Sequence, residues 1–466
     1  MSRLARYTLL FTGAFLILHG LSLASFFVEP LRSALFLIAL GAAAVCAFWK
    51  PEYILIPIVL ELLLDSSGHL FEWRGLSLRL LTLAIVLVAW LYHAIRARAL
   101  VTKLKTPFTL LYLVILAIVA LAVYNGYRNG HDVRLIIADA IPFLYLALWY
   151  PVRDVYFWML KQVQHDKIEA LVLGSFLGAA LLSIITLFLF SSGLQEIHGP
   201  FYTWWRDWVA GKATSTGFGF YRIVTPLHLF LTALVPYVGY RLLFSGSRIK
   251  SGMTVLLLTA VLLVPTINFS RIYFLAIIPA TLIMAWKLPW KKVLLTLILI
   301  GAISLGEYTL LNLAASRGTS FGFEFLTKQS RGIIDPESEA SASARAAILP
   351  HLIQKIKNRP ILGEGLGATV TYYNPFLQKE LTTPHLDWGY LELAVEFGLF
   401  AAWFFLGLLV WLFYRGFRNP LAASIIVFLL VTSITTPALF HVYGIALILA
   451  VLIANALPKL DKISQL

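Results

Sequence analysis

The fold is decided by apolar stretches such as residues 385–413, which read HLDWGYLELAVEFGLFAAWFFLGLLVWLF and contain no charged side chain after Glu396. A helix needs about 20 mainly apolar residues to cross a bilayer. Thirteen further segments share this character: 7–28, 32–49, 53–65, 79–95, 106–124, 134–150, 168–191, 223–242, 253–267, 272–286, 293–313, 420–436 and 441–457. The sequence therefore predicts an all-α polytopic membrane protein, with residues 1–466 as a single integral membrane domain of about 12–14 transmembrane helices.

Three of these segments leave the number of spans open. Segment 53–65 carries Glu61, which suits a re-entrant segment as well as a span. Segments 253–267 and 272–286 are separated only by residues 268–271. The N-terminal segment lacks a small-residue cleavage site, so we expect a retained first span rather than a removed signal peptide.

The composition excludes several protein classes. Sixty per cent of the 466 residues are hydrophobic and 13% are charged, whereas a soluble domain is about 45–50% apolar and about 25% charged. A soluble globular enzyme, a disordered chain and a collagen-like fibre are therefore excluded. The net charge of +14 points to a membrane rather than to nucleic acid. A single cysteine, Cys46, excludes an intramolecular disulfide and a thiolate metal cluster.

The distribution of lysine and arginine predicts the orientation. Twenty of them fall on one side of the predicted spans, and six lie in the short loops of the other side. Because cytoplasmic loops carry the excess of Lys and Arg, the N-terminus is expected in the cytoplasm. Two long loops, 192–222 and 315–384, then face outward. The second, which precedes the last three spans, is expected to be helical and functional because of its length.

One helix can be predicted inside the second long loop. Residues 340–357 read as an amphipathic helix that Pro350 would kink, because apolar positions recur at helical spacing. These positions are Ala347, Ile348, His351, Leu352 and Ile356.

Arg271 is a strong candidate functional residue, because it lies between two apolar runs at the predicted outer boundary. A charge at that depth is costly and suggests function by default. The alternative is an interfacial arginine that reaches the lipid headgroups.

His385 is expected to open the span that leaves the large loop, as a general base or as a donor to a diphosphate. Its neighbour Asp387 can hold the imidazole in one tautomer. Glu392 and Glu396 follow on the same predicted helix, with His385 near the same face. A lone histidine is more often a satisfied polar group, and the glutamates are equally compatible with a structural pairing to an arginine.

Arg222, His228 and Arg345 are further candidates, for which contact with solvent or headgroups is an equal alternative. We find no phosphate-binding Gly-x-x-x-x-Gly-Lys, no Asp-x-Asp pair for a metal and a nucleotide sugar, and no His-Glu-x-x-His. An ATP-driven pump, a metal-dependent nucleotide-sugar enzyme and a zinc protease are therefore disfavoured.

Three stretches together resemble the O-antigen ligase/polymerase family, over about residues 253–415. They are Ser270-Arg271 at the start of a span; Arg345 followed by Asn358-Arg359-Pro360-Ile361-Leu362-Gly363-Glu364-Gly365-Leu366-Gly367; and His385-x-Asp387-Trp388 followed by Glu392 and by Glu396-Phe397-Gly398. The family has about nine residues between its histidine and the Glu of Glu-x-Gly. Here His385 lies eleven residues before Glu396, so Asp387 is the alternative to His385. Arg222 and Arg206 are alternatives for the arginine of the first loop.

The resemblance implies a metal-independent, inverting glycosyltransferase of the GT-C type without a cofactor, in the bacterial inner membrane with its active site facing the periplasm. The donor would be a glycan on undecaprenyl diphosphate. The acceptor would be a sugar hydroxyl, on lipid A–core for a ligase or on a second lipid-linked glycan for a polymerase, with a chain-length regulator as a further partner. A transporter or flippase of lipid-linked glycans is the alternative, but it is expected to show two similar halves.

The resemblance also assigns roles to the candidate residues. Catalysis would rest on His385, Arg271 and Asp387, while Arg222, Arg271 and Arg345 would bind the diphosphate. Glu392, Glu396 and His228 would support them, and no residue would hold a metal.

Overall fold

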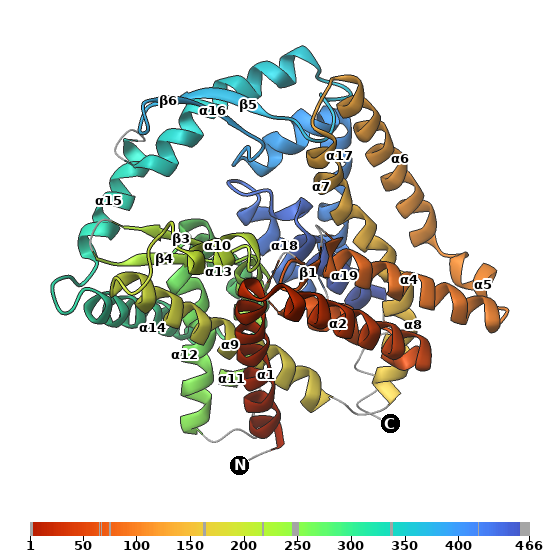
Figure 1. Cartoon of the computed structure of the whole chain (residues 1–466), viewed down its shortest axis with the longest axis horizontal. Helices are drawn as coiled ribbons and strands as arrows, with labels where there is room; N and C mark the ends of the chain where they lie inside the picture. The colour runs from red at the N-terminus through yellow and green to blue at the C-terminus, as the bar shows by residue number, and fades with distance from the viewer. Residues whose placement is uncertain are drawn as a thin grey trace. The chain divides into compact units, whose positions relative to one another are not determined.

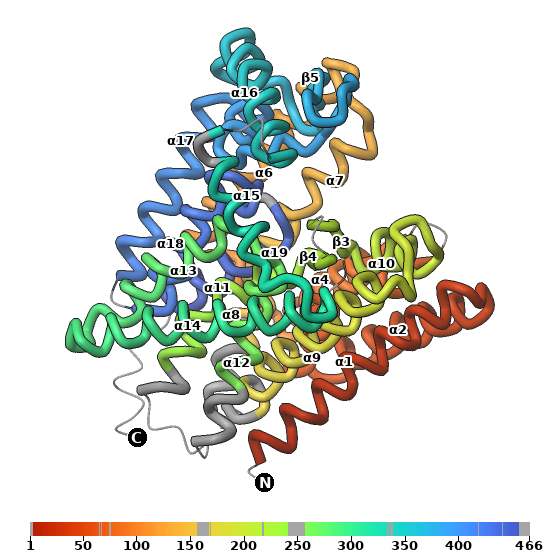
Figure 2. Tube along the Cα trace, turned by 90° about the vertical axis from the view of Figure 1, so that its left-hand side faces the viewer, coloured from red at the N-terminus to blue at the C-terminus, as the bar shows by residue number. Residues whose placement is uncertain are grey.

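The computed structural model describes residues 3–64, 66, 68–73, 76–161, 165–216, 219–244, 251–335, 339–417 and 419–456 (Figures 1 and 2). Helices dominate these residues, and their strands form three two-stranded hairpins. The chain is an all-α polytopic membrane protein, as the apolar segments predict. It divides into two compact units: Met1–Leu104 with Leu148–Gly322 as unit 1, and Lys105–Ala147 with Phe323–Leu466 as unit 2.

Among the described residues, eight helices are long and apolar enough to cross a membrane. They are Arg3–Phe27, Glu29–Trp49, Leu78–Arg96, Pro107–Arg128, Val133–Val155, Glu169–Ser191, Trp290–Ala315 and Gly389–Gly416. Five shorter apolar helices are Leu227–Tyr240, Leu257–Asn268, Arg271–Met284, Pro420–Thr432 and Val442–Asn455. Each corresponds to a segment expected from the sequence.

Unit 1 is built around the packing of its first helix on a later one. Its elements are α1 (Arg3–Phe27), α2 (Glu29–Trp49), η1 (Pro51–Tyr53), α3 (Ile56–Leu63), β1 (Glu72–Trp73), β2 (Leu76–Ser77), α4 (Leu78–Arg96), α5 (Leu100–Leu104), α8 (Trp149–Lys161), α9 (His165–Ser191), α10 (Pro200–Asp207), β3 (Lys212–Ser215), β4 (Tyr221–Val224), α11 (Leu227–Phe244), α12 (Ser251–Asn268), α13 (Arg271–Met284) and α14 (Trp290–Ala315). Helices α1 and α9 lie side by side (Figure 2). The Thr12 hydroxyl donates to the Gly174 carbonyl at 3.3 Å, because a glycine lets two membrane helices approach closely.

Segment 53–65 does not form a span. Helix α3 has eight residues, or roughly 12 Å of helix, which is too short to cross a bilayer. The side chain of Glu61 on α3 is paired with Arg79 on α4 at 2.7 Å, and both residues are buried. The expectation of a continuous helical span over residues 53–65 is therefore wrong.

Unit 2 contains the second long loop and the last three apolar helices. Its elements are α6 (Pro107–Arg128), α7 (Val133–Leu144), α15 (Phe323–Ile334), α16 (Ala340–Asn358), β5 (Val370–Asn374), β6 (Lys379–Thr383), α17 (Gly389–Gly416), α18 (Pro420–Thr432), η4 (Ala438–Phe440) and α19 (Val442–Ala456), and η2 (Tyr145–Leu148) follows α7 along the chain.

The predicted loop helix is confirmed as α16. One residue that was expected on its apolar face is exposed instead. The helix continues through Pro350. Ile348 and Leu352 are buried against Val370 of β5, but His351 is exposed and does not belong to the apolar face. Figure 1 shows the β5–β6 hairpin lying along α16.

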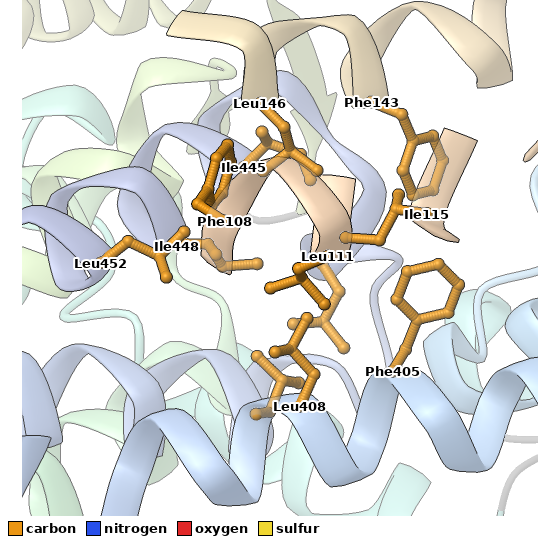
Figure 3. A pocket seen from close by; sticks show the side chains of 12 residues that line it. Phe108, Leu111, Ile115, Phe143, Leu146, Phe405, Leu408, Ile445, Ile448 and Leu452 are labelled. Atoms are coloured by element: carbon orange, nitrogen blue, oxygen red, sulfur yellow. The ribbon is translucent and has the colours of Figure 1, made fainter. Parts of the chain in front are cut away.

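A small cavity of about 40 Å³ lies inside unit 2, between α6, α7, α17 and α19. The side chains that line it are all apolar, with Phe143 and Phe405 on one side (Figure 3). A site for a sugar or a diphosphate needs polar groups to orient the ligand. This cavity is therefore part of the apolar core and not a site of that kind.

Candidate functional site

The connection between β6 and α17 carries two of the expected catalytic residues. Strand β6 ends at Thr383 and α17 begins at Gly389, so the expectation that His385 opens the helix is wrong. Leu386 is 0% exposed and belongs to the core beneath α16, whereas His385 is exposed and Asp387 is half-buried. Leu386 thus anchors a short loop that carries an exposed histidine and a half-buried aspartate.

Asp387 adopts a backbone conformation that limits what can replace it. Its φ angle is +54°, in the left-handed region that asparagine and aspartate tolerate better than most other residues. A test of its carboxylate therefore needs a substitution that keeps this conformation.

A cluster of carboxyl groups lies next to this loop. Glu392 and Glu396 are in the first turns of α17, and Glu396 is 6% exposed. Asp139 on α7 accepts a hydrogen bond from Gly367 N at 3.0 Å and lies near Glu396 and His385. Asp387 lies near Glu392. The structure therefore brings together His385, Asp387, Glu392 and Glu396, as expected, and adds Asp139.

The sequence offered a signal for Asp139 that our reasoning from the sequence missed. Asp139 lies in the apolar segment 134–150 with no other acidic residue. An ionisable residue inside a membrane helix is a functional candidate by default. Attention to acidic residues within spans, rather than only near the large loop, would have found it.

The helix that carries Glu396 is interrupted at Gly398. This glycine has φ +80° and ψ +166°, which is not a helical conformation. The glycine-rich segment Pro360–Gly367, here called the strap, binds the backbone groups that the break releases. The three hydrogen bonds are Leu399 N to Pro360 O (2.7 Å), Glu364 N to Val395 O (2.7 Å) and Gly365 N to Glu396 O (3.0 Å). The strap thus gives hydrogen-bond partners to backbone groups of the interrupted helix, which have no water to bind in apolar surroundings.

The other side of the strap is fixed to the end of α6. Gly365, at φ +95°, packs directly on the backbone of Gly126, so no side chain fits at that position. Four hydrogen bonds join the two segments: Leu366 N to Ala122 O (3.0 Å), Asn125 Nδ2 to Leu362 O (3.2 Å), Asn129 Nδ2 to Glu364 O (2.5 Å) and His131 Nδ1 to Leu366 O (2.8 Å). The strap therefore ties α6 to the half of α17 that carries Glu392 and Glu396.

Arg345 lies on α16, next to the His385–Asp387 loop. Its Nη2 donates to Ser341 Oγ at 2.7 Å, and its carbonyl accepts from Trp388 Nε1 at 3.2 Å. Within the described part of the chain, its buried Nε atom has no hydrogen-bond partner, and neither has the buried Oε2 atom of Glu392. Buried polar atoms are normally paired, so these two atoms are suited to contact with a ligand or water.

Two of the other expected arginines meet the connection between α12 and α13 in unit 1. Arg222 on β4 donates from Nε to the Asn268 carbonyl, at the end of α12, at 2.5 Å. Arg271 is the first residue of α13 and is half-buried. Ser270, the N-cap of α13, makes no side-chain capping bond. A helix N-terminus with basic side chains favours an anion, which agrees with the expected diphosphate contacts of Arg222 and Arg271.

His228 is a buried framework residue of unit 1. It is 0% exposed in the first turn of α11. Its Nδ1 accepts from Asn268 Nδ2 at 3.2 Å, so its Nε2 donates to Ser183 Oγ, also at 3.2 Å. With both nitrogens engaged, His228 supports the segment that holds Arg222 and Arg271 and does not itself face a substrate.

The remaining expectations concern Arg206 and metals. Arg206, the alternative to Arg222, lies exposed in the last turn of α10. Across the described ranges, no group of three or more His, Cys, Asp or Glu side chains is arranged to hold a metal ion.

Comparison with known proteins gives a match to a protein family. The model of the O-antigen ligase family matches residues 253–406. No curated protein matches the chain, and no solved structure matches it. The matched segment runs from α12 into α17 and contains Arg271, Arg345, His385 and Glu396. The match agrees with the resemblance seen in the sequence: residues 253–406, about a third of the chain, are similar to the O-antigen ligase family.

Proposed function

We propose that this protein transfers a glycan from undecaprenyl diphosphate to an acceptor sugar hydroxyl, as an inverting glycosyltransferase that needs no metal. The observation that carries the proposal is the match over residues 253–406, because that segment contains both the His385 loop and Arg271. The same match gives no support to a transporter or flippase. The lysine and arginine distribution supports a place in the bacterial inner membrane with the site toward the periplasm.

The chemistry requires a base and a stabilised leaving group. A bond forms between the acceptor oxygen and the anomeric carbon, while the bond from that carbon to the diphosphate oxygen breaks. The diphosphate leaves with the electron pair, and the acceptor proton passes to the base. His385 is the base in this proposal because it is exposed on an anchored loop. Asp387 remains the alternative.

In this proposal the arginines stabilise the diphosphate as it leaves. Guanidinium groups bind phosphate oxygens with paired, charge-assisted hydrogen bonds. Such groups stabilise the negative charge that grows on the diphosphate as it leaves. Arg222, Arg271 and the first turn of α13 suit this role in unit 1, and Arg345 suits it in unit 2.

Replacing Arg271 by alanine is expected to lower kcat/KM for the lipid-linked donor by roughly 10²–10³-fold, the usual effect of removing one donor to a developing negative charge. The measurement is the initial rate of glycan transfer by purified protein in lipid nanodiscs. Arg331→Ala is the matched control, because Arg331 is exposed on α15. Equal activity in both variants would remove Arg271 from the site.

A single assay distinguishes the two acceptors. Purified protein is incubated with undecaprenyl-diphosphate-linked glycan, with and without lipid A–core. A ladder of products without lipid A–core identifies a polymerase, whose product lengths a chain-length regulator would then narrow. One shifted band that needs lipid A–core identifies a ligase. Absence of any product in either condition would contradict the proposed function.

A further inference from the structure

A polar cavity of about 290 Å³ lies in unit 1, beside the ends of α2 and α4. Its polar lining residues are Glu52, Trp90, His93, Lys103 and Asp154. We propose that this cavity binds the headgroup of a phospholipid that carries a primary ammonium group. None of these residues is a candidate for glycan transfer, so the inference goes beyond the proposed function.

The cavity lies at the level where membrane-spanning helices end. Glu52 follows the end of α2 by three residues, and Trp90 and His93 are in the last two turns of α4. His93 joins the two helices, because its Nε2 donates to the Ala47 carbonyl at 3.2 Å. The ends of such helices lie at the depth of the lipid headgroups, where tryptophan is also enriched. A polar cavity at this depth is therefore within reach of a headgroup.

The path of the chain places the cavity on the side of the N-terminus. Helices α1 and α2 are consecutive and pack together, so α2 ends on the side where α1 begins. The Leu70 carbonyl accepts from Ser22 Oγ, near the far end of α1, at 2.6 Å. The rings of Trp73 and Phe36, in the first half of α2, have centroids 6.0 Å apart.

The stretch between α2 and α4 therefore returns the chain to the far side, although α3 alone is too short to cross. Helix α4 then runs back to the side of the N-terminus, where His93 meets the end of α2. The number of crossings on which the predicted orientation depends is thus unchanged here. That orientation puts the cavity in the cytoplasmic leaflet.

The charged groups around the cavity leave one charge of each sign incompletely paired. Asp154 accepts from Lys103 Nζ at 2.6 Å and from Trp90 Nε1 at 2.9 Å, and Arg153 Nη2 is 3.3 Å from its other oxygen. Two cations on one carboxylate leave a surplus positive charge. Within the described part of the chain, the buried Oε2 atom of Glu52 has no hydrogen-bond partner. The cavity therefore offers a cation and a carboxylate oxygen, which together complement a zwitterion.

A phosphate next to an ammonium group matches both. The phosphate accepts charge-assisted hydrogen bonds from Lys103 and Arg153. A primary ammonium has three N–H donors, one of which would satisfy Glu52 Oε2. A quaternary ammonium, as in a choline headgroup, has no N–H and would leave that buried oxygen without a partner, which is costly. The site is therefore expected to prefer the primary ammonium.

The test compares phosphatidylethanolamine with phosphatidylcholine that has the same acyl chains. Purified full-length protein in detergent is titrated with each lipid, and bound lipid is measured by native mass spectrometry. We expect wild type to bind phosphatidylethanolamine roughly tenfold more tightly, the value of one hydrogen bond to a charged group. Glu52→Gln keeps the size of the side chain but loses the charge, so the preference should fall to about twofold or less.

Lys103→Gln tests the phosphate side of the site. Glutamine can still donate to Asp154, but it carries no charge for the phosphate, which both lipids share. This variant is expected to bind both lipids more weakly and to keep their ratio. Glu29→Gln is the matched control, because Glu29 is exposed at the opposite end of α2. It should behave as wild type.

Three outcomes would overturn the inference. They are equal binding of the two lipids by wild type, a full preference retained in Glu52→Gln, and soluble phosphoethanolamine bound as tightly as the lipid. The last would show that the cavity takes a soluble compound and not a lipid. The unfolding temperature of each variant shows whether it is folded, and Lys103→Gln gives an independent result if Glu52→Gln is not. Lipid binding is measured without glycan transfer, so failure of the proposed function would not affect this test.

Discussion

Replacing His385 by alanine is expected to reduce glycan transfer by roughly 10²–10⁴-fold, the range that a positioned general base contributes. The protein should still insert and fold, because the side chain of His385 is exposed and the loop is anchored by Leu386, which is 0% exposed. The effect is expected on kcat, since the proton moves in the transition state and the donor is bound by other residues. The measurement is the initial rate at saturating lipid-linked donor, together with the thermal unfolding temperature.

Asp387 provides the decisive comparison. Its φ of +54° makes alanine a poor replacement, because alanine would add backbone strain to the loss of charge. Asp387→Asn keeps the left-handed conformation and removes only the carboxylate. We expect Asp387→Asn to retain more activity than His385→Ala. The opposite order, with His385→Ala active and Asp387→Asn inactive, would show that the aspartate is the base.

Replacing Gly365 by alanine is expected to destabilise unit 2 by more than about 3 kcal/mol, which is near the upper end for single substitutions. A Cβ at this position would meet backbone atoms of Gly126, Ala122 and Asn125, and backbone atoms have no rotamers that would relieve the contact. The strap would have to leave α6, and with it the bonds to the interrupted part of α17. The measurements are the unfolding temperature in nanodiscs and the transfer rate, and both should fall.

Gly130→Ala separates this contact from backbone strain alone. Gly130 has φ +74°, but nothing lies within 4 Å of a Cβ built on it. Alanine there should cost only the left-handed strain of about 1–2 kcal/mol and leave transfer intact. If Gly365→Ala is no more damaging than Gly130→Ala, the close approach of the strap to α6 is not what stabilises this region.

Much of the fold could be predicted from the sequence, because the cost of placing polar groups in a bilayer makes apolar length a strong signal. Thirteen of the fourteen apolar segments became apolar helices, and α16 appeared where helical spacing placed it. The exception was the short segment around Glu61. There the sequence shows the charge of Glu61, but it does not show that Arg79 on the next helix pairs with it.

The interior of the site could be predicted only in part. His385, Asp387 and Glu396 were recognised because they lie within twelve residues of one another, at a spacing that places His385 and Glu396 near one face of a helix. The break at Gly398 was not foreseen, because glycine is common inside membrane helices that are unbroken. Asp139 and Gly367 of the strap are far apart in the chain, and their hydrogen bond forms only in the folded structure. Side chains that meet only through tertiary packing leave no periodic pattern to detect.

The strap also has a consequence for the order in which the chain is assembled. Asn125 of α6 and Leu362 of the strap are 237 residues apart, so α6 leaves the ribosome long before its partner exists. Contacts at such separation form late, after the intervening chain has been placed. Closure of the strap onto α6 is therefore a late step of biogenesis, whereas the bonds of the strap to the interrupted part of α17 join segments that are close in the chain. A chain truncated before Pro360 would therefore leave α6 without its partner, a state that membrane quality control would be expected to recognise.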